Sequence, residues 1–64
     1  MINWEEEHLR STTCGFPKHA GEGWYAVIQE DRDYVRWILE NIEDLADDDR
    51  DALEWGVEHV PDRF

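Results

Sequence analysis

An excess of acidic residues is the feature that most constrains this chain. Asp and Glu number 17 against 6 Lys and Arg, which gives a formal net charge of -11 over only 64 residues. Repulsion among these charges opposes a compact state, and a chain this short buries only about 60% of its unfolded surface. We therefore expect one small, marginally stable domain over residues 1–64 that salt stabilises. Its eight aromatic residues supply much of the buried area.

The acidity is concentrated in the second half of the chain. Residues 40–58 hold nine carboxylates and a single base, Arg50. Because phosphate binding requires Lys and Arg, we expect no direct binding of nucleic acid. An acidic surface also disfavours anionic membranes, and no apolar run approaches the roughly 20 residues that span a bilayer. With one cysteine, Cys14, and no basic N-terminal region, the sequence predicts a cytoplasmic protein without an intrachain disulfide.

The residue pattern predicts an α-dominated α+β fold, with about three short helices and a short β-hairpin or loop between the first and the second. Asn3 is a good N-cap, and Glu6 lies at the capping-box spacing, so the first helix begins there and ends near residues 10–12. Ile2 before the cap fits a hydrophobic staple. Residues 13–23 have turn composition, whereas residues 24–28 (WYAVI) have strand-like content, which predicts a hairpin across 13–28.

Two further helices follow from helical spacing of apolar residues. Asp31 or Asp33 caps the first of them. Its expected inner residues are Tyr34, Trp37, Ile38, Asn41, Ile42 and Leu45, with Val35 and Leu39 widening the face. Asp47 is expected to cap the last helix, over about residues 48–60, which Pro61 ends. The expected inner stripe of that helix is Leu53, Val57 and Val60.

The last predicted helix carries an acidic stripe. Its four acids are spaced 4, 3 and 4 residues apart, which places them on one face: Asp47, Asp51, Glu54 and Glu58. Like charges at this spacing destabilise a helix by about 0.2–0.5 kcal/mol per pair, so the stripe indicates either a function or adaptation to high salt. Trp55 lies about 200° around the helix from Leu53. It is therefore either an interface anchor beside the stripe or packed against the N-terminal helix or a dimer mate.

The sequence shows no arrangement typical of catalysis or of zinc binding. Cys14 and His19 are close in sequence, but no oxyanion signature surrounds them. A structural zinc site shows four Cys or His ligands with paired short spacings. The available residues, Cys14 with His8, His19 and His59, do not meet that pattern. We therefore expect neither an enzyme nor a bound zinc ion.

A calcium loop is the other metal site that the spacing suggests. Four acids fall at positions 1, 3, 5 and 12 of an EF-hand-type loop: Asp47, Asp49, Asp51 and Glu58. Ala52 stands where the loop turn requires Gly, and Glu54 stands where an apolar residue is usual. The same segment fits a helix well, so we expect no cofactor and no metal.

Two segments carry a family resemblance: FPKHAGEGW over residues 16–24 and DRDYVRWILEN over residues 31–41. They resemble the small domain at the C-terminus of exodeoxyribonuclease X-like proteins, which also stands alone in phage and bacterial proteins. The match covers about residues 14–55. The matching turn residues are Phe16, Lys18, His19, Gly21 and Trp24, whereas Pro17 replaces a Gly of the family and Ala20 and Glu22 replace Lys. The resemblance implies a hairpin-plus-helices fold, a setting in DNA metabolism and no catalytic activity.

These observations lead to one functional hypothesis and two alternatives. Carboxylates one helical turn apart are about 6 Å apart, comparable to successive phosphates on a strand. We expect an acidic DNA mimic, encoded by a phage or mobile element, that blocks the basic DNA-binding cleft of a repair glycosylase such as uracil-DNA glycosylase, a nuclease or a defence effector. The chain would act as a monomer or homodimer. The expected contact residues are Glu40, Glu43, Asp44, Asp47, Asp48, Asp51, Glu54, Trp55 and Glu58.

The two alternatives use other features of the sequence. The first is an accessory module of DNA processing that contacts nucleic acid or a nuclease through Lys18, His19 and Trp24 of the turn. The second is a small scaffold protein of a halophile, in which the acidity serves solvation alone.

Overall fold

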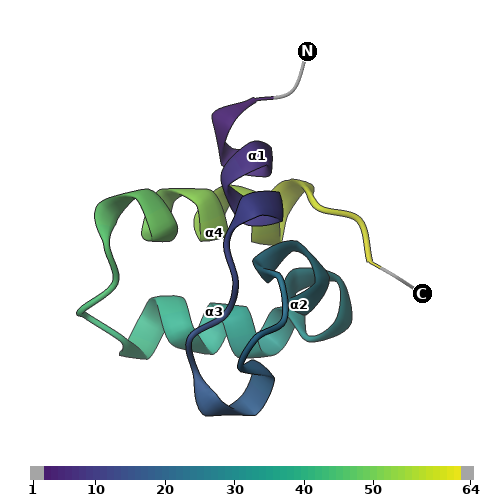
Figure 1. Cartoon of the computed structure of the whole chain (residues 1–64). Coiled ribbons are helices and arrows are strands. Elements are labelled where there is room, and N and C mark those ends of the chain that lie inside the picture. Colours follow the sequence, from purple (N-terminus) through teal and green to yellow (C-terminus); the bar gives the residue numbers. More distant parts are fainter. Residues whose placement is uncertain (1–2, 63–64) are drawn as a thin grey trace.

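A computed structural model of the chain describes residues 3–62, which form four α-helices and one short 3-10 helix (Figure 1). The α-helices are α1 (Trp4–Ser11), α2 (Trp24–Glu30), α3 (Arg32–Asn41) and α4 (Asp47–His59). The 3-10 helix, η1 (Pro17–His19), lies in the connection between α1 and α2. The α-dominated character expected from the sequence is therefore confirmed, whereas the expected count of three helices is wrong.

Helix α4 is the element on which the others assemble. It contacts α1, α2 and α3, and its most extensive contact is with α1. Figure 1 shows α3 and α4 running in opposite directions, with α1 crossing α4. Because α4 has packed neighbours on several sides, only part of its surface faces solvent. The acidic residues of α4 other than the half-buried Asp49 occupy that part.

The core lies between the four α-helices. Its buried residues are Leu9, Cys14, Trp24, Val27, Ile28, Val35, Ile38, Ala52, Leu53 and Val60. At Gly56 a Cβ atom would stand 2.5 Å from Cδ1 of Ile28 and 2.9 Å from Cδ1 of Leu9. The missing side chain of Gly56 is therefore what lets α1 and α2 approach α4 so closely.

The start of α1 and the end of α4 follow their local sequence signals, whereas the start of α4 does not. The side chain of Asn3 accepts a 3.2 Å hydrogen bond from the backbone N–H of Glu6, which confirms the expected N-cap of α1. The expected staple involves Ile2, which lies outside the described residues. Helix α4 ends at His59, and Val60 adopts an extended backbone before Pro61, as a residue before proline prefers. The N-cap of α4 is Ala46, so the prediction of Asp47 as the cap is wrong; Asp47 is the first residue inside the helix.

The predicted hairpin across residues 13–28 is wrong. Within residues 3–62 the only β pairing is an isolated antiparallel bridge between Thr13 and Gly23, and the expected second strand is helix α2. Three residues of that helix, Trp24, Val27 and Ile28, are buried. They are spaced by three and four residues, which is the spacing of one helix face. A run of five apolar residues fits a strand and a buried helix equally well by periodicity, and packing against three other helices selects the helix.

Helix α3 is shorter than predicted and turns a different face inward. It ends at Asn41, so Ile42 and Leu45 lie in the connection to α4, where they still pack against the core. Its buried residues are Val35 and Ile38, whereas Trp37 is 51% exposed. The predicted inner position of Trp37 is therefore wrong. Tyr34 is half-buried and stacks on the Trp37 ring, with centroids 6.3 Å apart.

Candidate protein-binding surface

The acidic stripe of α4 faces solvent. Its four members, Asp47, Asp51, Glu54 and Glu58, are all exposed. So are the other acids that the sequence singled out around it, Glu40, Glu43, Asp44 and Asp48. In the part of the chain that the structure describes, none of these eight carboxylates forms an ion pair. We call these eight residues the acidic surface: five lie on α4, Glu43 and Asp44 lie in the connection before it, and Glu40 lies near the end of α3.

The few internal partners of this region lie at its edge. Asp49 is half-buried and its carboxylate lies 2.6 Å from Nε2 of His8, which joins α4 to α1. Arg50, the single base between residues 40 and 58, directs its guanidinium to the carbonyl oxygens of Ile42 and Glu43, both at 3.4 Å. Arg50 therefore holds the connection between α3 and α4 and leaves the neighbouring carboxylates unpaired.

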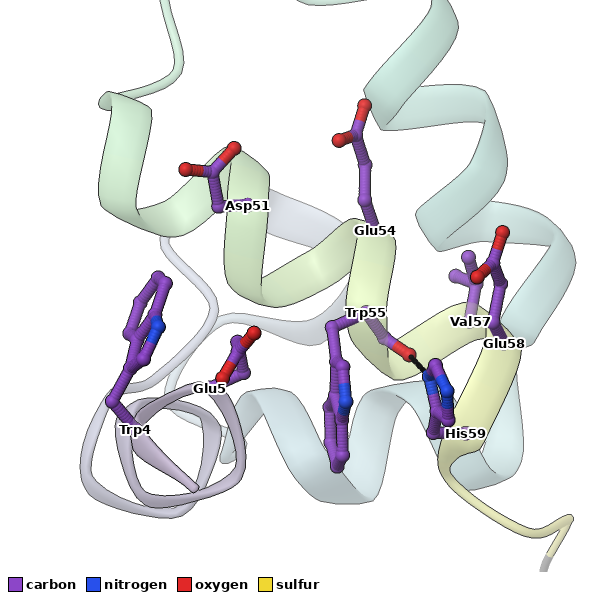
Figure 2. A pocket seen from close by; sticks show the side chains of 8 residues that line it. All are labelled: Trp4, Glu5, Asp51, Glu54, Trp55, Val57, Glu58 and His59. Atoms are coloured by element: carbon purple, nitrogen blue, oxygen red, sulfur yellow. Dashed lines mark hydrogen bonds between the residues drawn. The ribbon is translucent and has the colours of Figure 1, made fainter.

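A groove with a volume of about 510 Å³ lies between α1 and α4, next to the stripe (Figure 2). Helix α1 contributes Trp4 and Glu5. Helix α4 contributes Asp51, Glu54, Trp55, Val57, Glu58 and His59. In Figure 2 the Glu5 side chain lies between the two indoles, and the carboxylates of Asp51 and Glu54 stand above them. Two indole rings and four carboxylates thus share one open depression.

Trp55 combines features of the two alternatives that the sequence left open, packing and exposure. It is half-buried and packs against the core, yet it also lines the groove. Its ring stacks on His59 with centroids 5.0 Å apart and an interplanar angle of 11°. The Nδ1 atom of His59 lies 2.9 Å from the carbonyl oxygen of Trp55. These contacts hold the Trp55 ring in place and leave part of it open to the groove.

Trp4 and Glu5 are site residues that the sequence analysis missed. Trp4 is 50% exposed and contacts the His8 ring edge-on, with centroids 6.2 Å apart. Glu5 is half-buried and has no ion-pair partner within residues 3–62. The available signal was an aromatic residue in the first turn of α1, away from the buried Leu9. Only the contact between α1 and α4 shows that these residues face Trp55.

The charged turn residues of the family resemblance, Lys18 and His19, contact acidic and aromatic side chains of this chain. Lys18 Nζ lies 2.8 Å from a carboxylate oxygen of Asp31. His19 bridges two acids, with Nδ1 2.6 Å from Glu22 and Nε2 3.1 Å from Asp31. The ammonium of Lys18 lies 4.8 Å from the centroid of the Tyr34 ring. These contacts join η1 to the start of α3.

We call Lys18, His19, Glu22 and Asp31 the turn cluster, in which side chains of opposite charge lie within hydrogen-bond distance of one another. Hydrogen bonds to Glu22 and Asp31 raise the pKa of His19 above its usual value. The hydrogen bond to Asp31 likewise raises the pKa of Lys18. In return, hydrogen bonds from Lys18 and His19 lower the pKa of Asp31. Each of the three groups therefore stabilises the charged form of its partner.

The remaining turn residues have structural positions. Trp24 is 3% exposed and contacts Phe16 edge-on, with ring centroids 6.2 Å apart. Trp24 therefore has almost no exposed surface for the partner contact that the accessory-module alternative assigns to it. Gly21 has a φ of +86°, a left-handed conformation that favours glycine, and it closes the turn.

Metal-ligating side chains do not cluster within residues 3–62, where no group of three or more His, Cys, Asp or Glu is placed to hold a metal ion. The segment with EF-hand spacing lies in helix α4, as the helical alternative predicted. Cys14 is buried in the core. None of the helices of this part of the chain combines the length and the apolar character that a bilayer crossing requires.

No family model, curated protein or solved structure matches this chain. The resemblance to the exodeoxyribonuclease X-like domain stays a prediction that rests on the residues quoted for it. The features of the molecule that bear on function are therefore the geometry and charge of the surface formed by α1 and α4.

Proposed function

We propose that this protein is a non-enzymatic acidic protein that binds the basic DNA-binding surface of a DNA-processing enzyme and blocks access of DNA. One observation carries the proposal: eight exposed carboxylates lie on α4, in the connection before it and near the end of α3, with no ion-pair partner in residues 3–62. Such an arrangement presents a fixed array of negative charge, which is the property by which basic clefts recognise a DNA backbone.

The position of the acids supports a binding role. Asp51, Glu54 and Glu58 share one face of α4, and the opposite face, with Ala52, Leu53 and Gly56, is buried. A helix packed in this way holds its outer carboxylates at nearly constant spacing, so a partner meets a preorganised surface. Complementary charge of this kind accelerates association, while an aromatic anchor beside it slows dissociation. Trp55 and Trp4, which line the groove beside these acids, are the proposed anchors.

Capture from an extract tests the proposal. The full chain is immobilised, incubated with bacterial extract at low salt, and eluted with duplex DNA; the eluted proteins are identified by mass spectrometry. Each captured enzyme, together with uracil-DNA glycosylase, is then tested for displacement of a labelled duplex by the free chain. We expect at least one DNA-processing enzyme to release its duplex.

A matched pair of variants makes this test specific. Asp51→Lys with Glu54→Lys changes the acidic surface, whereas Glu7→Lys with Asp33→Lys changes the net charge equally at exposed sites outside it. The first variant should weaken displacement by about tenfold or more, and the second should leave it within about twofold. If both variants lost displacement of the duplex equally, the net charge of the chain, and not the position of its acids, would determine displacement. If the chain captured no basic protein and were folded only at molar salt concentrations, the result would instead support the alternative that its acidity is an adaptation to high salt.

A further inference from the structure

The groove between α1 and α4 combines features that recognise one kind of side chain. We infer that it binds an arginine side chain of a protein partner, with the guanidinium against the indoles of Trp4 and Trp55 and paired to Glu5. This inference rests on the proposed function in one respect, since it requires a basic partner. It goes further because it names the group that is bound and the place where it binds.

The groove is rich in negative charge, which favours the binding of a cation. Four of its lining residues, Glu5, Asp51, Glu54 and Glu58, are acids. Within residues 3–62 none of them has an ion-pair partner. Glu5 is half-buried, so its carboxylate is partly shielded from water while it remains unpaired. A cation that entered beside it would relieve the repulsion among the four carboxylates and would be screened less than on an open surface.

The indoles select the kind of cation. Trp is the aromatic side chain that binds cations most strongly through its ring face, and Trp4 leaves half of its surface open. A guanidinium is planar, so it stacks on a ring and still donates hydrogen bonds in its own plane to carboxylates. A lysine ammonium is more strongly hydrated and offers no flat face. The joint presence of indole faces and carboxylate acceptors therefore favours arginine.

The chain already uses the same chemistry inside its own fold. The guanidinium carbon of Arg10, on α1, lies 4.1 Å from the centroid of the Tyr25 ring of α2. The groove differs because no Lys or Arg of residues 3–62 lines it, and the imidazole that does, His59, is stacked on Trp55. Its cation must therefore come from outside the described part of the chain, and the basic surface of a partner supplies one.

Titration of the full, ¹⁵N-labelled chain with the peptide acetyl-Gly-Arg-Gly-amide tests this inference. The signals observed are the indole N–H resonances of the four tryptophans. We expect saturable shifts at Trp4 and Trp55 and none at Trp24 or Trp37. Trp37 is an internal control, since it is as exposed as Trp4 but does not line the groove. The same peptide with citrulline, which is neutral and nearly isosteric, should shift none of the four.

Two substitutions add a second control. Glu5→Gln should lower the affinity for the arginine peptide by about three- to fivefold, and Trp4→Leu should lower it by a similar factor. Glu7→Gln removes an exposed carboxylate that lies outside both the groove and the acidic surface, and it should leave the affinity unchanged. Equal shifts from the citrulline peptide, equal shifts at Trp37, or equal losses for Glu5→Gln and Glu7→Gln would each overturn the inference. Equal affinity for a lysine peptide would overturn the preference for arginine.

The outcomes separate this inference from the proposed function. If the arginine peptide binds as described while no DNA-processing enzyme releases its duplex, the groove stands and the proposed function fails. If an enzyme is inhibited but the peptide shifts neither Trp4 nor Trp55, the acidic surface acts without the groove and this inference fails alone.

Discussion

The guanidinium of Arg32 donates a 2.6 Å hydrogen bond to the carbonyl oxygen of Val57, which joins the first residue of α3 to the last turn of α4. The Nη2 atom of Arg32 donates a second hydrogen bond to the carbonyl oxygen of Val60. The same atom lies 2.9 Å from a carboxylate oxygen of Asp62. The last carbonyls of a helix lack partners within the helix, and a cation placed there also interacts favourably with the helix dipole. Arg32 thus acts as a C-terminal cap from another helix.

Replacing Arg32 should therefore destabilise the fold more than replacing a surface arginine. We expect Arg32→Gln to lower the free energy of unfolding by about 2 kcal/mol, the scale for hydrogen bonds to charged groups whose partners are left unsatisfied. Urea denaturation followed by circular dichroism measures the change. Arg36→Gln, at an exposed position of the same helix, should change stability by less than about 0.5 kcal/mol. Similar losses for both variants would show that Arg32 is not a cap.

The close approach at Gly56 makes a second prediction. Gly56→Ala gains about 1 kcal/mol of helix propensity, but its Cβ would meet terminal methyl groups of Leu9 and Ile28, both fully buried. Overpacking of this kind costs about 1–3 kcal/mol, so we expect a net loss of stability. Gly15→Ala, which meets nothing within 4 Å, is the control and should be nearly neutral.

A double-mutant cycle identifies the contact at Gly56. Ile28→Val removes the Cδ1 methyl that stands nearest to the new Cβ. The combined variant should therefore be more stable than the sum of the two single changes predicts, by an interaction energy of about 0.5 kcal/mol or more. Strict additivity, measured by urea denaturation of all four proteins, would show that this methyl group moves aside without cost.

The turn cluster predicts how stability depends on pH. The pKa of His19 is raised above 6.5, so its contribution to stability is fully present below pH 6.5 and is lost as pH rises through the higher folded value. The pKa of Asp31 is lowered below 3.8, so its contribution is present above pH 3.8 and is lost as pH falls through the folded value. We expect the contribution of this cluster to be greatest between these two limits.

Comparison with a His19 variant isolates this effect from the other histidines. The urea midpoint of the parent should decrease as the pH is raised from 6 to 9. The His19→Gln variant should show a smaller decrease, because the contribution of His19 is missing. NMR titration of the His19 ring should show a pKa above that of a histidine in an unstructured peptide. A ring that titrates at or below the peptide value would contradict the proposed role of Glu22 and Asp31.

Charge reversal at the two ends of α4 should have opposite effects on stability. Asp47 is the first residue of the helix, where a negative charge interacts favourably with the dipole, whereas Glu58 lies in the last turn, where it does not. We expect Asp47→Lys to lower, and Glu58→Lys to raise, the free energy of unfolding by about 0.3–1 kcal/mol each. The difference should shrink in 1 M NaCl, where exposed charges are screened. Equal gains would mean that net charge outweighs the dipole.

The local signals of the sequence predicted some elements well and one badly. The Asn3 cap of α1 and the end of α4 before Pro61 depend on residues adjacent in the chain, and both were predicted. The segment 24–28 was predicted as a strand because five consecutive apolar residues show no clear period. For Trp37 the spacing predicted an inner position, but α3 turns Val35 and Ile38 to the core instead. That rotation depends on how α3 packs against α2 and α4.

The sequence by itself determined the net charge, the acidic stripe of α4, the first helix cap and the proline stop, because each depends on composition or on residues within one or two helical turns. Only the tertiary structure decided that segment 24–30 is a helix, that Trp24 is buried, and that Trp4 and Glu5 face Trp55 across a groove. These properties depend on contacts between residues up to about fifty positions apart. No local pattern encodes them, since the same amphipathic helices could pack with other faces together.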